Sequence, residues 1–150
     1  MTALFTPTVR VLEHEGILAA LSLSSSLVRA HEQISEGLPV SIIREAANKA
    51  QLDEGYLLRL VGVDRSTYHR RLKHPEKTWS VEQGARIYAS VRVLDAAARL
   101  FDHDYVKAVD WLNQPAKALG GQPPAAMLKT PAGTEAVLDL IGRIGHGVIS

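Results

Sequence analysis

Histidine is the residue type in this 150-residue chain best suited to bind a metal or move a proton, because the chain has six histidines and no cysteine. Two strings, His14-Glu15 and His31-Glu32, begin like the His-Glu-x-x-His motif of zinc proteases. The second histidine of that motif would fall at Leu18 and at Ser35. The histidines therefore predict no metal site.

Other catalytic patterns are missing from the sequence as well. The lack of cysteine excludes disulfides, thiolate metal sites and cysteine nucleophiles. No Gly-x-Ser-x-Gly or P-loop string occurs, and Gly142, Gly145 and Gly147 follow no strand pattern that would make a dinucleotide loop. We predict no catalytic residues and no cofactor, so that a small helical enzyme is a remote alternative.

Charged residues are distributed unevenly, although the net charge of the chain is only +1. Residues 41–80 carry eight Lys or Arg against five Asp or Glu. The polar side chains predicted to face outward there are Arg65, Ser66, Thr67, His69, Arg70, Arg71 and Lys73. Arginine can bind guanine through two acceptors, and Ser, Thr and His can donate to bases or phosphates. On charge alone, a merely solvated helix face is the better interpretation.

The elements around these residues change that preference in favour of DNA. A short helix over 54–61, a turn at Gly62-Val63 and a helix over 64–74 have the lengths of a helix-turn-helix, whose second helix enters the major groove. Asp64 can cap the second helix, and Pro75 ends it. Tyr68 and Leu72, four residues apart, can pack with the apolar residues of the first helix.

Composition and periodicity predict an all-α fold for the whole chain. Apolar residues make up 46% and aromatic residues 5%, and no alternating run indicates a sheet. Apolar spacing predicts helical pieces over 9–23 and 27–37, the second capped by Ser26, and another helix opening at Pro39. A capping box at Ser80 and Gln83 starts a long helix over 81–101.

The last third of the chain is predicted to form a second helical unit. Either Asp102 or Asp104 begins a helix that runs to Pro115, and a turn follows at Gly120-Gly121. Thr130 and Pro131 begin the final helix. The predicted organisation is an N-terminal helical extension over 1–38, a helix-turn-helix domain over 39–101 and a small helical domain over 102–150.

Residues 60–72, LVGVDRSTYHRRL, resemble the helix-turn-helix of Xre-type antitoxins. Asp64 replaces the usual serine and is still a capping residue, and Tyr68 replaces a leucine. The tail, with GRIGHGV at 142–148, is similar to the toxin-binding domain of the Xre, MbcA and ParS antitoxins. Together these resemblances cover about residues 40–150.

The resemblance implies an antitoxin of a type II toxin-antitoxin system. Its partner would be a RES-domain toxin that depletes NAD, so the NAD chemistry belongs to the partner. The C-terminus is expected to cover the toxin's active site, with Arg143 pairing an acidic or polar group there. The expected toxin-binding residues are Arg143, Ile144, His146, Gly147, Val148 and Ser150. Without the resemblance, a helix that ends at Gly145 and frays would be the better interpretation.

The helix-turn-helix implies double-stranded operator DNA as a second partner and repression of the chain's own operon. Specific binding by a single helix-turn-helix usually needs a dimer, so we expect a homodimer and a larger complex with the toxin. The sequence contains no signal peptide or membrane span, which favours a cytoplasmic location. The alternative is a stand-alone regulator with a C-terminal dimerisation domain.

Overall fold

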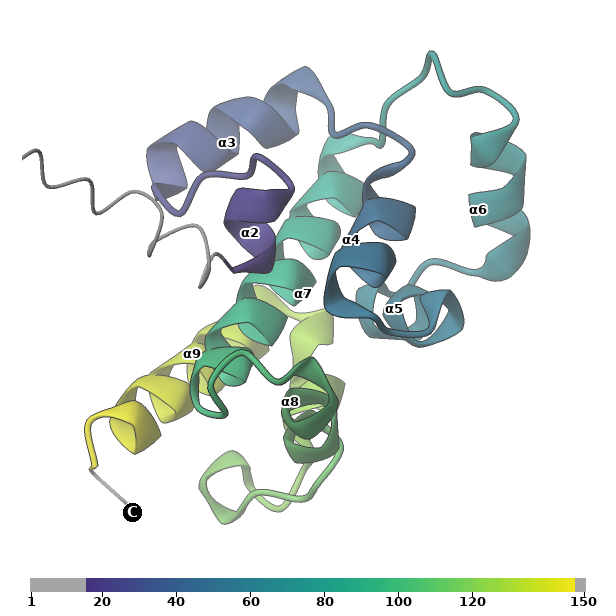
Figure 1. The fold of residues 1–150 in the computed structure, drawn as a ribbon. Coiled ribbons are helices and arrows are strands. Elements are labelled where there is room, and N and C mark those ends of the chain that lie inside the picture. Colours follow the sequence, from purple (N-terminus) through teal and green to yellow (C-terminus); the bar gives the residue numbers. More distant parts are fainter. Residues whose placement is uncertain (1–15, 148–150) are drawn as a thin grey trace, which may run out of the picture.

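The computed structural model describes residues 16–147, which form a bundle of helices around one long central helix, α7 (Val81–Arg99) (Figure 1). Within these residues there is no strand, and the only β-type pairing is an isolated bridge between Pro39 and Thr78. The all-α prediction is therefore confirmed, with a helix-turn-helix followed by a smaller helical part.

The other elements follow one another along the chain with short connections. They are α2 (Ile17–Ala20), α3 (Leu27–Glu36), α4 (Ile42–Ala50), α5 (Glu54–Val61), α6 (Arg65–Leu72), α8 (Tyr105–Leu112), the 3-10 helices η1 (Lys117–Leu119) and η2 (Pro124–Lys129), and α9 (Pro131–Gly145). The α5–α6 pair lies on one side of α7 in Figure 1, and α8 and α9 lie around its C-terminal half.

Side-chain caps explain where most of these helices begin. In six of the described helices the residue before the first turn accepts a backbone N–H from three residues further on; these caps are Ser26, Asp53, Asp64, Ser80, Asp104 and Thr130. Each such cap is worth about 1 kcal/mol. Of the two aspartates that the sequence left open for α8, Asp104 is the cap.

The core runs continuously through the molecule along α7. Val93, Leu94, Ala97 and Ala98 of this helix are fully buried. Helix α7 packs against α2, α3 and α5 from the first half of the chain and against α8, η2 and α9 from the second half. One cluster of buried residues, reaching from Ile17 to Ile141, joins both halves.

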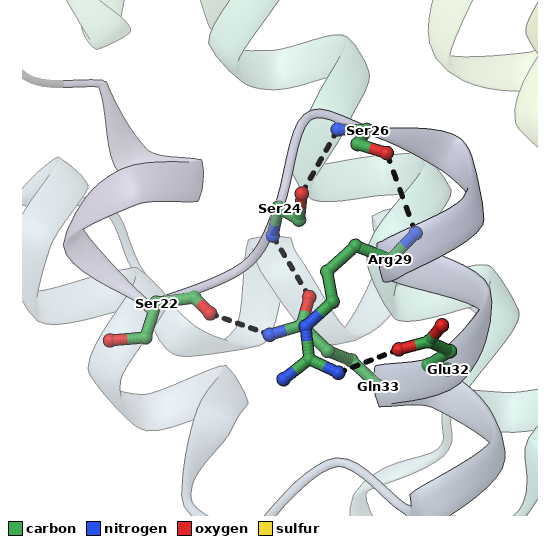
Figure 2. Close-up of polar contacts among 6 residues, drawn as sticks. All are labelled: Ser22, Ser24, Ser26, Arg29, Glu32 and Gln33. Carbon is green, nitrogen blue, oxygen red and sulfur yellow. Dashed lines mark hydrogen bonds and ion pairs between the residues drawn. The ribbon is translucent and has the colours of Figure 1, made fainter.

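The serine-rich stretch after α2 is an ordered turn (Figure 2). The amide of Gln33 donates to the Ser22 carbonyl at 2.8 Å and accepts from the Ser24 N–H at 2.9 Å. The Ser24 hydroxyl oxygen in turn accepts the Ser26 N–H at 3.0 Å. The Tyr88 hydroxyl of α7 donates to the Ser24 carbonyl at 2.7 Å. These bonds fix α3 on the central helix.

Several helix boundaries differ from the sequence prediction. Helix α6 ends at Leu72 rather than at 74, and α8 ends at Leu112, before Pro115. Of the helix predicted over 9–23, only Ile17–Ala20 is helical in the described part, and the chain turns at Ser22, whose φ is 59°. Residues 9–15 lie outside the described residues. The long helix ends at Arg99 rather than at 101, because Asp102 and His103 form a turn with positive φ values of 53° and 65°.

Candidate functional site

The turn between α5 and α6 depends on a glycine. Gly62 ends α5 with a φ of +82°, a conformation that L side chains rarely adopt, and its N–H donates to the Leu58 carbonyl at 2.8 Å. A Cβ atom at Gly62 would also collide with the guanidinium of Arg86 from α7. The positive φ of the turn therefore favours glycine, and a larger residue would in addition have to displace the flexible Arg86 side chain.

Asp64 begins α6, as the sequence predicts. Its carboxylate accepts the Thr67 N–H at 2.7 Å and the Ser66 hydroxyl at 2.8 Å. The hydrogen bond from the Thr67 backbone, followed by that from Ser66, lowers the pKa of Asp64. The Ser66 hydroxyl is thus already occupied in capping the helix.

Tyr68 anchors the inner face of α6. Its side chain is fully buried, and Leu72 is packed against the same core one turn later. Burial, together with the charge of Glu54, raises the pKa of Tyr68 to about 12. The predicted register of the second helix is therefore confirmed, and the opposite face is turned to solvent.

Most of the predicted DNA-binding side chains lie on that outer face. Those that are exposed are Arg65, Ser66, His69, Arg70 and Lys73, and Thr67 is half-buried. Arg65 leans back toward α5, since a Cβ atom at Gly55 would lie 2.7 Å from its guanidinium nitrogen. Arg70 points along α6, where its guanidinium lies 3.5 Å from the Thr67 hydroxyl.

Arg71 departs from the predicted outward position. Its side chain is half-buried, and its guanidinium donates to the Thr78 carbonyl at 3.0 Å and to the Gln83 side-chain oxygen at 3.3 Å. The same group lies over the ring of Trp79, 5.4 Å from the ring centre. The sequence missed these contacts because their acceptors lie beyond Pro75, in the next loop and helix.

The C-terminal helix α9 begins at Thr130, whose hydroxyl oxygen accepts the Gly133 N–H at 3.0 Å. A Cβ atom at Gly133 would collide with the Met127 carbonyl of η2, so α9 and η2 are in backbone contact. Val137, Leu140 and Ile141 bury the inner face of α9. Close packing on η2 and α7 thus fixes the direction in which the helix end points.

Most of the predicted toxin-binding residues lie at the end of α9. Arg143 pairs with Asp139 of the same helix at 3.2 Å and keeps 41% of its side chain exposed. Ile144 is half-buried, whereas His146 and Gly147 are exposed. The predicted Val148 and Ser150 lie outside the described residues. The described part of the tail therefore presents one guanidinium beside a glycine-containing, accessible backbone.

A hollow that the sequence analysis did not predict lies beside this helix end. It has a volume of about 630 Å³ and is bounded by residues of α7 and α9, among them Arg99, Leu100, Leu138, Ile141 and His146. Its lining comes from helices far apart in the sequence, so spacing alone gives no signal for it. His146, just past the exposed end of α9, forms part of the wall of this hollow.

Asp95 is a buried acid that the sequence analysis did not assign to any role. Only 2% of the residue is exposed, and its carboxylate accepts the Ile17 N–H at 2.9 Å and the Tyr105 hydroxyl at 3.4 Å. The Arg99 guanidinium binds its other oxygen at 3.0 Å. A Cβ atom at Gly16 would collide with this carboxylate. Asp95 therefore caps α2 from the central helix.

Residues 16–147 contain neither a cluster of metal-binding side chains nor a membrane-spanning helix. No group of three or more His, Asp or Glu side chains in this part of the chain has an arrangement that could hold a metal ion. None of its helices is both long enough and apolar enough to cross a membrane.

The fold and the exposed basic face define a helix-turn-helix protein with a helical C-terminal domain. Family models match both parts: the antitoxin Xre-like helix-turn-helix domain over residues 29–92, and the antitoxin Xre/MbcA/ParS C-terminal toxin-binding domain over residues 96–147. The first match begins before residue 40, where the resemblance seen in the sequence started.

Two relatives agree with these matches. An Antitoxin Xre of Photorhabdus laumondii subsp. laumondii is 36% identical over 146 residues, covering 97% of this chain and 98% of the relative. An Antitoxin Xre of Yersinia enterocolitica is 37% identical over 119 residues, covering 79% of this chain and 80% of the relative. The chain belongs to the Xre family of antitoxins.

Proposed function

We propose that this antitoxin binds and neutralises a RES-domain toxin that depletes NAD, and that it represses its own operon by binding operator DNA. The accessible end of α9 carries the proposal for the toxin. There a half-exposed arginine and an exposed histidine stand on a helix held rigidly by its contact with η2. The match to a toxin-binding domain over 96–147 supports the assignment of a toxin partner to this half.

Arg143 is the residue we assign to the toxin's active site. In the free chain its guanidinium is paired with Asp139, whose side chain is 71% exposed. An exposed pair of this kind is worth only a few tenths of a kcal/mol, so an acidic group of the toxin can replace it at little cost. Ile144, His146, Gly147, Val148 and Ser150 would complete the contact, with the chain end covering the active site.

The outer face of α6 is the proposed DNA-binding surface. Arg70 and His69 occupy its middle, where they can reach base edges in the major groove, and Lys73 lies at its end, where a phosphate would pass. Arg65 and the capping residues lie at the helix start, where backbone N–H groups favour phosphate.

We also propose that two copies pair as a homodimer on a partly palindromic site, that the domains divide near residue 101 and that the protein acts in the cytoplasm.

The neutralisation proposal is tested by co-expressing the chain with the protein encoded beside it, which the proposal expects to be a RES-domain toxin. The intact chain should restore growth and cellular NAD, whereas deletion of residues 143–150 and Arg143→Ala should both weaken the rescue. Lys117→Ala, which removes an exposed cation from the same half, is the matched control and should rescue fully. Full rescue by the deletion variant would show that neutralisation does not depend on the tail covering the toxin's active site.

The DNA proposal is tested with the DNA segment directly upstream of the coding sequence. Replacing Arg70 by alanine should cost about 1–3 kcal/mol of binding free energy and relax sequence preference, if this residue contacts a base. Lys73→Ala should weaken binding to all sequences alike and reduce the dependence on salt by about one phosphate contact. Equal, sequence-independent losses in both variants would reduce α6 to a phosphate-binding helix.

A further inference from the structure

The end of α6 is joined to the rest of the molecule by a loop over residues 73–80, and Arg71 spans that loop. Figure 1 shows α6 standing away from α7, with the loop connecting the two. Arg71 is the last but one residue of α6, yet its guanidinium contacts the loop at Thr78 and the first turn of α7 at Gln83. One side chain thus links the recognition helix, the loop and the central helix.

The far end of the loop is itself firmly attached. The Trp79 N–H donates to the Leu38 carbonyl at 2.9 Å, and the Trp79 side chain is only 2% exposed. Thr78 pairs with Pro39 in the isolated bridge, and its side chain lies so close to Gly37 that a Cβ atom there would collide with it. Thr78, whose carbonyl accepts the hydrogen bond from Arg71, is therefore held in place by its contacts with residues 37–39.

Around the near end of the loop, basic side chains surround a polar hollow of about 550 Å³. Its lining residues are Thr67, Arg70, Arg71, His74, Lys77 and Gln83. No acidic side chain lines the hollow itself, although the Glu76 carboxylate lies 3.4 Å from His74 Nδ1. His74 and Lys77 belong to the loop rather than to α6. The arrangement suits a single phosphate group of a DNA backbone passing beside the recognition helix.

We propose that Arg71 is a positioning residue for DNA binding and not itself a phosphate ligand. This inference rests on the proposed function of α6. By holding Thr78 and Gln83, Arg71 keeps the loop folded against α6, so that Lys77 and His74 stand beside Arg70 where the phosphate would bind. Two of its N–H donors are directed toward Thr78 and Gln83, which leaves Arg70 and Lys77 to meet the DNA.

Arginine is specifically required for this role. Its planar group can donate to two acceptors in different directions while one face lies on the Trp79 ring, at 5.4 Å from the ring centre. Lysine has the same charge, but its compact ammonium group cannot reproduce the planar contact and the two divergent hydrogen bonds together. A charge-conserving substitution therefore separates the two roles, since a simple phosphate contact would tolerate it.

The test compares Arg71→Lys with Arg59→Lys, which makes the same change at an exposed arginine of α5 whose guanidinium lies 6.0 Å from the Tyr56 ring centre. Binding is measured by titrating the DNA segment directly upstream of the coding sequence. Arg71→Lys should bind about tenfold more weakly than the wild type, and Arg59→Lys should bind equally well. Wild-type affinity in Arg71→Lys would overturn the inference.

A double-mutant cycle with Lys77→Ala shows whether Arg71 acts through the loop. If it does, Arg71→Lys should cause little further loss once Lys77 is gone, because the placement of Lys77 no longer matters. Independent, additive losses, with a smaller salt dependence in Arg71→Ala, would identify Arg71 as a phosphate ligand and overturn the inference.

Hydrogen exchange of the DNA-free protein provides a readout that does not depend on operator binding. The Lys77 N–H, which donates to the His74 carbonyl at 3.0 Å, should exchange at least several-fold faster in Arg71→Lys, while amides of α9 stay unchanged. Unchanged exchange at Lys77 would overturn the inference and leave DNA binding by α6 intact. Failure of the wild type to bind the upstream DNA would instead overturn the proposed DNA binding, and the positioning role with it.

Discussion

At the scale of single residues, the contacts of the buried polar groups are what the sequence did not predict. Asp95 lies within the long helix predicted over 81–101, where both it and the neighbouring Leu94 are buried. Arg99 lies one turn further along the same helix, but the other partners, Ile17 and Tyr105, come from α2 and α8. No local pattern links an aspartate to a helix start 78 residues earlier. Long-range capping of this kind is invisible to periodicity.

Tyr105 gives this buried cluster a measurable pH dependence. Burial, followed by the charge of Asp95, raises the pKa of Tyr105 to about 12, so the folded state favours its neutral form. The stabilising contribution is therefore complete below about pH 10, the value of a free tyrosine, and is lost as the pH rises toward 12. Tyr105→Phe should lose less stability than the wild type between these two pH values.

Urea unfolding at a series of alkaline pH values measures this difference, with each variant referred to its own stability at pH 8. The lysines and the other tyrosines also ionise at alkaline pH, but they are common to both proteins and cancel in the comparison. If the stability of Tyr105→Phe falls with rising pH as steeply as that of the wild type, the raised pKa of Tyr105 is contradicted.

At the scale of secondary-structure elements, the sequence predicted more successfully. The caps at Ser26, Asp64, Ser80 and Thr130 and the stop at Gly62 were predicted correctly, because each depends on residues within about four positions. The predicted outward exposure also holds for most of the polar side chains of α6, since buried Tyr68 sets the register; their binding to DNA stays a prediction. Arg71 differs because the groups that draw it inward lie in another element.

The contact between α9 and η2 leads to a prediction for two glycines of the same helix. A Cβ atom at Gly133 would collide with the Met127 carbonyl, whereas one at Gly142 would meet nothing within 4 Å. Gly133→Ala should destabilise the fold by about 1–3 kcal/mol through this overlap. Gly142→Ala should be neutral or stabilise it by up to about 1 kcal/mol, since alanine favours a helix.

Thermal unfolding of the two alanine variants checks this pair, and each acts as the control for the other. Equal unfolding temperatures of the two variants would show that η2 can move away from α9 without a loss of stability. Because Gly142 lies beside the proposed toxin-binding residues, a stabilised Gly142→Ala would also be a useful background for neutralisation assays.

At the scale of the whole molecule, the two family matches meet within α7, between residues 92 and 96. The core does not divide there, because Val93, Leu94, Ala97 and Ala98 are buried in one cluster that reaches both halves. The sequence predicted two consecutive domains with a boundary at residue 101, and that boundary stays a prediction. The periodicity of apolar residues shows that α7 is long, but it does not show which other helices pack against it.

A shared core predicts that both halves unfold together. The chain has two tryptophans, and Trp79 lies in the first half while Trp111 lies in the second. Variants that keep a single tryptophan, Trp79→Phe and Trp111→Phe, should each show one fluorescence transition that coincides with the loss of helical circular dichroism. A transition of Trp111 that is separate from the loss of the remaining helix would indicate two independent folding units.

The position of the family junction inside α7 also limits how such antitoxins can exchange specificities. A hybrid that joins the DNA-binding part of one relative to the toxin-binding part of another at this junction would be spliced inside the C-terminal part of α7, the longest helix of the described residues. Both donors would then have to supply matching buried faces for every helix that packs on α7. Viable chimeras are therefore expected only between relatives whose central helices are interchangeable, whereas the exposed outer face of α6, the proposed DNA-binding surface, can diversify freely.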